Sequence, residues 1–324
     1  MPETIIESIA DYSLSKTNKS TKLFSKVGIV CCEEDGQYIA RVCSSYGLDV
    51  TFWELTPERI KWSLGCIEAI MDSRIKNWGA TESEKKAVMS RIKGTTSFLD
   101  LKDCDLIIET VSAFSIGRNL EARKKVFEDL EKIVSPTCII ATNSTSIIIS
   151  ELCENLKYKE RCISIHFMIN SVDSRIVEIT KGLYTSSEAF EKVSQFIKMV
   201  KRKAIPVEES VGFISVRMFS VMLNEACQLV LEGVGKMDDI EQLMMTGYGM
   251  RLGPFAIADI MGIDRASRWM EKLFNEFGDT RFKPNPLIKK MLRQQRYGVS
   301  CGKGFYCYDD KGEQIKQSNY NFKE

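Results

Sequence analysis

The sequence contains one histidine in 324 residues, and this scarcity limits the chemistry available to the chain. Zinc sites are built mainly from cysteine and histidine. The eleven cysteines are scattered, and no Cys-x-x-Cys spacing occurs. We therefore expect no metal site. Scattered cysteines are typical of reduced thiols rather than of a disulfide framework, so the cytoplasm is the expected compartment.

The chain also lacks a charge excess and a long apolar run. It has 45 Lys and Arg against 44 Asp and Glu, a formal net charge of +1 at pH 7. This balance argues against a nucleic-acid partner. No apolar run approaches the ~20 residues that span a bilayer, so no membrane partner is expected. Glu3, Glu7 and Asp11 near the N-terminus argue against a mitochondrial presequence.

Apolar strand patterns alternate with helical patterns up to about residue 207. The predicted strands are residues 27–31, 50–53, 106–109, 138–142, 162–167, 176–179 and 205–207. The predicted helices are residues 36–46, 57–76, 82–93, 120–133 and 187–203. The segment 57–93 looks like a helical hairpin inserted after the second strand. Such alternation predicts a Rossmann-type α/β domain over residues 1–207, with a doubly wound, mostly parallel sheet.

Only helical patterns follow residue 208. The predicted helices are residues 211–232, 238–246, 255–277 and 286–295. A chain of 324 residues is long enough for two hydrophobic cores. We therefore expect an all-helical C-terminal domain over residues 208–324.

The single histidine lies in a predicted strand and has a carboxylate nearby. Strand alternation places His166 on the face opposite Ile165, and Glu178 on the face opposite Val177. A carboxylate beside an imidazole orients the ring and stabilises its protonated form. The pair is therefore a candidate general base with its orienting acid. The alternative is a structural histidine beside a solvated glutamate.

The turn after the first strand departs from the dinucleotide-binding pattern Gly-x-Gly-x-x-Gly. Cys31 and Glu33 stand at the first two glycine positions, and only Gly36 remains. A glutamate adds bulk where a pyrophosphate approaches the backbone, and the next two residues are also acidic. Glu54, eighteen residues after Gly36, is the candidate ribose-binding acid. The alternative is a sheet that kept its fold and lost its nucleotide.

Together these segments resemble the 3-hydroxyacyl-CoA dehydrogenase (3-hydroxybutyryl-CoA dehydrogenase) family from about residue 26 to residue 308. Each motif alone is weak, but their order and spacing are specific. The motifs are residues 107–109 (IIE), 141–146 (ATNSTS), 166–167 (HF), 177–179 (VEI), 212–214 (GFI) with Arg217, 253–255 (GPF) with Asp259, 262–264 (GID) and 302–306 (GKGFY).

The resemblance implies an NAD-dependent enzyme that oxidises the 3-hydroxyl of an acyl-CoA, or reduces the 3-oxo form. His166 matches the catalytic base, and Glu178 matches the acid paired with it. Thr145 stands where the family has a serine that bonds the substrate oxygen.

The resemblance also implies a cofactor site, a CoA site and an oligomer. The positions assigned to NAD are Cys31, Glu33, Gly36, Glu54, Glu109 and Asn143. Because of the altered loop, we expect NAD to bind weakly or not at all. The hairpin 57–93 matches an element that helps to hold CoA, and the helical half matches a homodimerisation domain.

The departures from the family cluster at the predicted site. Ile169 replaces an asparagine on the nicotinamide side. The family's Val-Asn-Arg reads Ser215-Val216-Arg217, so an asparagine that helps to polarise the substrate carbonyl is lost. Residues 112–118 look like an extension. Three functions remain open: an active dehydrogenase with weakened cofactor affinity, an impaired relative that binds an acyl-CoA or a protein, and a dehydrogenase for another 3-hydroxy acid or cofactor.

Overall fold

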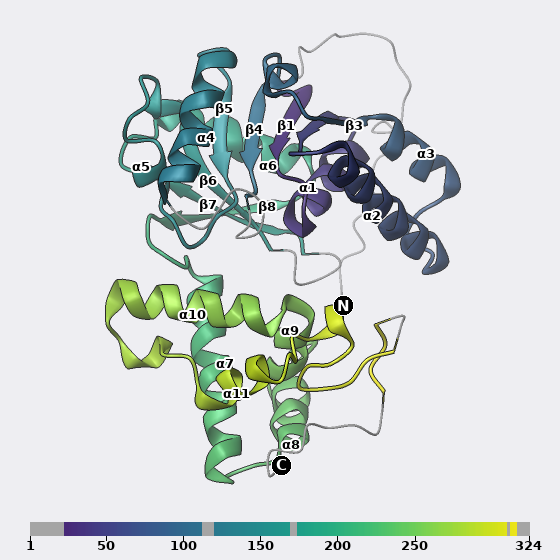
Figure 1. The fold of residues 1–324 in the computed structure, drawn as a ribbon, viewed down its shortest axis with the longest axis vertical. Coiled ribbons are helices and arrows are strands. Elements are labelled where there is room, and N and C mark those ends of the chain that lie inside the picture. The colour runs from purple at the N-terminus through teal and green to yellow at the C-terminus, as the bar shows by residue number, and fades with distance from the viewer. Residues whose placement is uncertain (1–22, 112–119, 169–173, 310–311, 316–324) are drawn as a thin grey trace, which may run out of the picture.

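The structure is a computed structural model that describes residues 23–111, 120–168, 174–309 and 312–315. Ile169, the segment 112–118 and the three N-terminal acidic residues named above lie outside the described residues. Figure 1 shows two parts, a sheet flanked by helices and, below it, a group of helices.

Eight strands form one sheet in the order β3-β2-β1-β4-β5-β6-β7-β8. β1 to β6 run parallel, β7 is antiparallel to β6, and β8 is parallel to β7. The order reverses between β1 and β4, as at the switch point of a Rossmann fold. The predicted fold class is confirmed. The strands are β1 (Lys26–Val30), β2 (Asp49–Trp53), β3 (Ile92–Thr95), β4 (Leu106–Glu109), β5 (Ile139–Thr142), β6 (Cys162–Phe167), β7 (Ile176–Lys181) and β8 (Lys203–Glu208).

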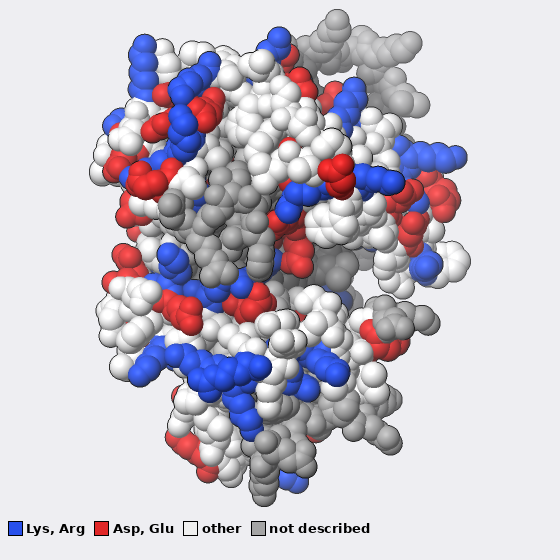
Figure 2. All heavy atoms as spheres, in the orientation of Figure 1, with Lys and Arg blue, Asp and Glu red and all other residues white. Residues whose placement is uncertain are grey.

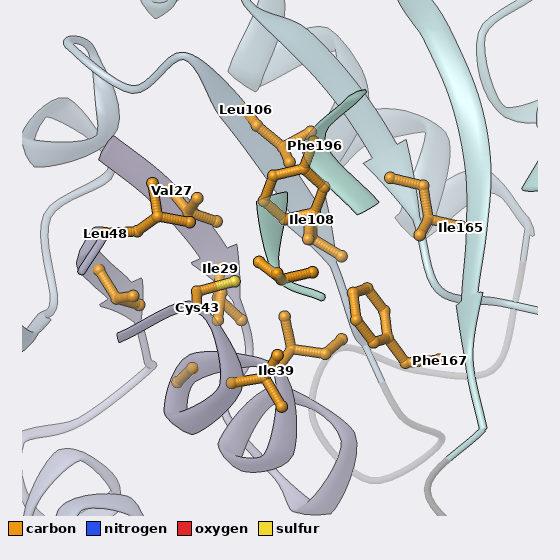
Figure 3. Close-up of a cluster of buried hydrophobic side chains, with 14 of the residues drawn as sticks. Val27, Ile29, Ile39, Cys43, Leu48, Leu106, Ile108, Ile165, Phe167 and Phe196 are labelled. Atoms are coloured by element: carbon orange, nitrogen blue, oxygen red, sulfur yellow. The ribbon is translucent and has the colours of Figure 1, made fainter. Parts of the chain in front are cut away.

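Helices cover both faces of the sheet. On one face, α1 (Glu34–Ser45), α2 (Pro57–Lys76), α3 (Glu82–Ser90) and α6 (Ser187–Met199) share an apolar cluster with the strands. Figure 3 shows part of this cluster, where Ile29 and Ile108 of the sheet lie near Ile39 of α1 and Phe196 of α6. On the other face, α4 (Leu120–Ile133) and α5 (Ile149–Leu152) contribute to a second cluster.

The edge strand β3 is absent from the predicted strands, and the predicted hairpin 57–93 is too long. α3 ends at Ser90, and the chain enters β3 two residues later. Only Ile92 of this four-residue strand is buried, so the strand leaves little hydrophobic pattern. Its Gly94 permits close packing, because a Cβ there would lie 2.2 Å from Cγ2 of Ile60 on α2.

The C-terminal helices have a core of their own, which includes Leu223, Phe255, Met270 and Ile288. The predicted helix 255–277 is two helices, because Gly262 adopts φ 93° between them. The predicted helix 211–232 starts late, because Gly212 and Phe213 both have positive φ. The helices are α7 (Ser215–Glu232), α8 (Met237–Gln242) with the π-helical turn Leu243–Gly247, α9 (Pro254–Met261), α10 (Ile263–Phe277) and α11 (Pro286–Arg293).

Short 3-10 helices complete the described elements, at Phe98–Leu101, Lys159–Arg161, Thr280–Phe282 and Val299–Cys301. After residue 210 the only β-structure among the described residues consists of isolated bridges. β8 ends at Glu208 and α7 begins at Ser215. The domain boundary at residue 207 stays a prediction. Among the described residues, none of the helices combines the length and apolar character that a bilayer crossing requires.

A buried carboxylate fixes the C-terminal segment to α9. Asp259 accepts hydrogen bonds from the backbone N–H groups of Phe305 and Tyr306, both at 2.8 Å, and from the Tyr308 hydroxyl at 2.9 Å. Burial nevertheless raises the pKa of Asp259 from 3.8 to about 6. A Cβ at Gly304 would lie 2.0 Å from Oδ1 of Asp259, so this approach requires glycine.

We predict that Asp259 makes folding stability depend on pH. The folded protein holds the Asp259 proton more tightly than the unfolded chain, so the contribution of this group falls as pH rises from about 4 to about 6. In urea unfolding, the free energy of unfolding of wild type relative to Asp259→Asn should fall as pH rises from about 4 to about 6. Tyr308→Phe is the control: it keeps the carboxylate but removes a hydrogen bond that lowers the Asp259 pKa, so the pH dependence should persist and extend to higher pH. A difference that is flat across this range would contradict the prediction.

Candidate active site

A cleft of about 730 Å³ lies between the carboxyl edge of the sheet and α10. In open α/β sheets, ligands bind at this edge, near the switch point of the strand order. On the face shown in Figure 2, acidic and basic side chains lie side by side where the two parts of the molecule meet. The predicted site residues that line the cleft are Glu33, Asn143, Thr145 and His166.

The antiparallel pairing of β6 with β7 places His166 directly opposite Glu178. The Nδ1 atom of His166 lies 2.8 Å from Oε2 of Glu178, and both side chains are buried. An ionised carboxylate only accepts hydrogen bonds, so Nδ1 is the protonated nitrogen in this pair. Nε2 is then the nitrogen available to a ligand in the cleft. The structure therefore brings the predicted pair together.

Glu178 is also bound to the start of α7. Its Oε1 accepts hydrogen bonds from the backbone N–H groups of Ile214, at 3.1 Å, and Ser215, at 2.9 Å. Its Oε2 accepts a bond from the Ser215 hydroxyl at 2.6 Å. Burial raises the pKa of Glu178, but the bonds from His166 and Ser215 outweigh it and hold the pKa below the usual value. The carboxylate is therefore charged at neutral pH.

Ser215 is a site residue that the sequence analysis missed. Serine is a common N-cap residue, but Ser215 is the first residue of α7, and Ile214 stands at the N-cap. The bonding partner of Ser215 lies 37 residues away, and no local pattern shows that contact. The neighbouring Val216 is buried against Leu273 and Phe282, so this position, where the family has asparagine, presents an apolar side chain to its surroundings.

Thr145 and Asn143 follow β5. The backbone C=O of Thr145 accepts a hydrogen bond from Gly212 N–H at 2.6 Å, which ties this turn to the chain leading into α7. The Asn143 side chain accepts a bond from Phe167 N–H at 2.9 Å and donates to Asp35 at 2.8 Å. Asn143 therefore connects the end of β6 to the altered loop.

The altered loop keeps the backbone path of a glycine loop. Cys31 has φ 68°, a left-handed conformation that a glycine adopts without strain and a cysteine does not. A Cβ at Gly36 would lie 2.6 Å from the Cys31 carbonyl oxygen. The last glycine is thus required for α1 to pack against the sheet, as its place in the fingerprint predicts.

Two arginines form ion pairs with the three acidic residues of the loop, which the sequence analysis did not foresee. Arg59 of α2 contacts Glu33 at 2.5 Å, and Arg265 of α10 contacts Glu34 at 2.5 Å and Asp35 at 3.0 Å. We call these contacts the loop ion pairs. Those of Arg265 join the loop to α10. The carboxylates are therefore less repulsive to an anion than the sequence suggests, but both arginines are occupied.

Glu54 lies at the end of β2, as predicted, but is fully buried. Its Oε1 accepts a hydrogen bond from Cys32 N–H at 2.6 Å, and its Oε2 accepts one from Nε of Arg59 at 2.9 Å. Arg59, and not Glu54, lines the cleft. The structure places Glu54 beneath a guanidinium rather than at the cleft surface.

Glu109 is likewise fully buried at the end of β4. Its carboxylate accepts hydrogen bonds from Arg123 of α4, from the Thr142 hydroxyl at 2.7 Å, and from Val111 N–H at 2.6 Å. Arg123 lines the cleft and donates to the Ser144 hydroxyl at 3.1 Å. The sequence analysis missed Arg123. The available signal was an arginine on the buried face of an amphipathic helix.

No group of three or more His, Cys, Asp or Glu side chains suited to a metal ion occurs among the residues described here. The cleft therefore offers an imidazole, hydroxyls, an amide and paired charges. This set suits proton transfer to and from a polar ligand oxygen.

Two family profiles match the chain in succession. The profile "3-hydroxyacyl-CoA dehydrogenase, NAD binding domain" matches residues 26–210, and the profile "3-hydroxyacyl-CoA dehydrogenase, C-terminal domain" matches residues 212–308. The chain belongs to the 3-hydroxyacyl-CoA dehydrogenase family. The resemblance seen in the sequence motifs is thereby confirmed.

Relatives in the family align over most of their length. A probable 3-hydroxybutyryl-CoA dehydrogenase of Bacillus subtilis is 31% identical over 276 residues, which cover 85% of this chain and 94% of that protein. The 3-hydroxybutyryl-CoA dehydrogenase of Clostridioides difficile is 30% identical, covering 88% and 99%. The crystal structure of (S)-3-hydroxybutyryl-CoA dehydrogenase from Ralstonia eutropha superposes with a TM-score of 0.78 at 31% identity, covering 89% and 100%.

We predict that the Arg123–Glu109 pair is coupled. Arg123→Met leaves a buried carboxylate without its cation and should lower the free energy of unfolding by about 3–5 kcal/mol. The double variant Glu109→Gln, Arg123→Met removes both charges and should recover most of this loss. Urea unfolding measures both. A single-variant loss below about 1 kcal/mol would show that other groups neutralise Glu109.

Proposed function

We propose that the protein is an NAD-dependent 3-hydroxyacyl-CoA dehydrogenase, which transfers a hydride between NAD(H) and a 3-hydroxyacyl-CoA or 3-oxoacyl-CoA. The observation that carries this proposal is the His166–Glu178 pair at the cleft of the family fold. The relatives named above support the substrate class, because their names specify 3-hydroxybutyryl-CoA.

The residues account for the proton that accompanies the hydride. NAD(H), held by the loop 31–36, the end of β4 and Asn143, would supply the hydride acceptor or donor for the carbinol carbon. Nε2 of His166 takes the proton of the substrate hydroxyl, and the charged Glu178 stabilises the resulting imidazolium. The Thr145 hydroxyl lies in the same cleft and donates a hydrogen bond to the substrate oxygen. In the reduction, His166 returns the proton.

We predict that turnover depends on His166. With acetoacetyl-CoA and NADH, His166→Ala should lower kcat by roughly 10²–10⁴, the usual contribution of a positioned general acid or base. Glu178→Gln should lower kcat by a similar or smaller factor. The two losses should not add in the double variant, because the pair acts as one unit. Wild-type turnover in His166→Ala would make the only imidazole structural.

We infer that NAD(H) binds this protein weakly. Two of the three fingerprint glycines are replaced, and the loop holds three carboxylates against two arginines. The remaining features favour a dinucleotide: the switch-point cleft, the path of the loop, and Gly36. The loop 31–36, the end of β4 and Asn143 are the groups we assign to the cofactor.

We predict that Cys31→Gly, Glu33→Gly tightens NADH binding, measured by fluorescence titration. The change opens the backbone to the pyrophosphate and frees Arg59 from Glu33. It also removes the strain of a cysteine in the left-handed conformation. The matched variant Cys31→Ser, Glu33→Gln removes the charge but keeps the side chains, so it separates charge from access. A wild-type dissociation constant in the low micromolar range would contradict weak binding.

The alternative function is a catalytically impaired family member that binds an acyl-CoA or a protein. Glu54 and Glu109 are buried in ion pairs with arginines, but this does not favour the alternative over the dehydrogenase that the family matches support. Acyl-CoA binding without detectable NADH binding would select this alternative. In either case we assign CoA to the side of the α2–α3 hairpin, where the exposed Trp62 lines the cleft.

We propose a homodimer formed through the C-terminal helices, and the cytoplasm as the compartment. Among the apolar residues of the C-terminal helices, Leu223, Phe255, Met270 and Leu273 are buried within the protomer and are not available to an interface. The support comes instead from other apolar side chains that are at least 47% exposed. They are Met218, Leu231, Val234, Leu243 and Tyr248. The scattered cysteines, without a Cys-x-x-Cys spacing, favour a reducing compartment.

We predict that light scattering at micromolar concentration gives twice the 36.9 kDa chain mass. Met218→Glu should shift the mass toward the monomer, because it places a charge on an apolar surface of α7. Leu99→Glu, at an exposed apolar residue next to the sheet, is the control and should leave the mass unchanged. A wild-type mass of a single chain would reject the dimer.

A further inference from the structure

Oε2 of Glu178 accepts two hydrogen bonds, and the second donor has no assigned role. His166 Nδ1 lies 2.8 Å from this oxygen, and the Ser215 hydroxyl lies 2.6 Å from it. The hydroxyl oxygen is also 3.4 Å from Nδ1. Imidazole, carboxylate and hydroxyl thus form a compact triangle.

We propose that Ser215 is a positioning residue that fixes Oε2 of Glu178 and, by sharing this oxygen with the imidazole, lowers the proton affinity of His166. The kinetic part of this inference rests on the proposed function, whereas the effect on the imidazole itself does not.

The physical basis is competition between two donors for one acceptor. Each donor withdraws charge from Oε2 and weakens the other bond. The bond from His166 is strongest when the ring is protonated. The competing Ser215 bond therefore removes more stabilisation from the protonated ring than from the neutral ring. Ser215 therefore favours the neutral ring. That is the form required to accept a proton from a substrate hydroxyl.

Backbone contacts hold Glu178 in place, so this effect depends on the Ser215 hydroxyl alone. Oε1 of Glu178 is held by the backbone N–H groups of Ile214 and Ser215, which every side chain at position 215 retains. Glu178 therefore keeps its place when the hydroxyl is removed. Ser215→Val removes the hydroxyl and keeps the two backbone N–H donors. Threonine has the shape of valine but carries the hydroxyl.

The other charged groups of the cleft remain the same in both variants. Among the described residues, Glu178 is the only charged group that hydrogen-bonds to the imidazole. The remaining charged groups that line the cleft or support it are the loop ion pairs, the buried Arg123–Glu109 pair, and Asp264, Arg268, Glu271 and Lys272 of α10. Any difference between the two variants therefore comes from the hydroxyl at position 215.

The test uses the fact that His166 is the only histidine. A proton NMR titration of the full chain shows one imidazole Cε1–H resonance, which needs no assignment. Ser215→Val should raise the pKa of His166 by about 0.5, whereas Ser215→Thr should stay within about 0.2 of wild type. Circular dichroism confirms that both variants fold. Should Ser215→Val fail to fold, Ser215→Ala replaces it with the same expectation.

The kinetic readout is the pH profile of hydroxyl oxidation. The acidic limb of kcat/KM should move up by the same amount in Ser215→Val and remain in place in Ser215→Thr. An unchanged or lowered pKa in the valine variant overturns the proposal, as does a threonine variant that behaves like valine. Absence of turnover in every variant removes the proposed function, but the NMR titration still decides the role of Ser215.

Discussion

The carboxylate of Glu178 connects the sheet, the only imidazole and the helical part. It accepts one bond from β6, through His166, and three from the start of α7. This arrangement depends on the reversal of β7. Antiparallel strands place two residues directly opposite each other after a short connection, so residues twelve positions apart meet. The same carboxylate then fixes where the second part of the chain begins.

The sequence predicts local features. It fails for very short elements and for contacts between residues far apart in the chain. Central strands such as β4 and β5 are buried at all four positions, so their apolar runs are visible. Alternation also predicts that His166 and Glu178 face away from the packed side. β3 is too short and polar to detect, and the break at Gly262 depends on a positive φ that composition does not reveal. The contact of Arg265 with Asp35 spans 230 residues and has no local signal.

Two strand-end carboxylates show the same arrangement. Glu54 after β2 is neutralised by Arg59 of the following helix, and Glu109 of β4 is neutralised by Arg123 of the following helix. A buried carboxylate needs such a partner, because an unpaired charge in the interior is costly. The result is a rigid edge whose charges are compensated internally.

The Arg265 contacts with Glu34 and Asp35 also make the link between the loop and α10 sensitive to salt. The Glu34 side chain is 63% exposed, so water and salt screen this link. An exposed ion pair contributes about 0–1 kcal/mol, and a link of ~1 kcal/mol is broken for roughly a sixth of the time. The Arg265–Glu34 contact therefore opens spontaneously, while the less exposed contact of Arg265 with Asp35 still joins the loop to α10. Because ions screen the attraction further, this link between the loop and α10 weakens as ionic strength rises.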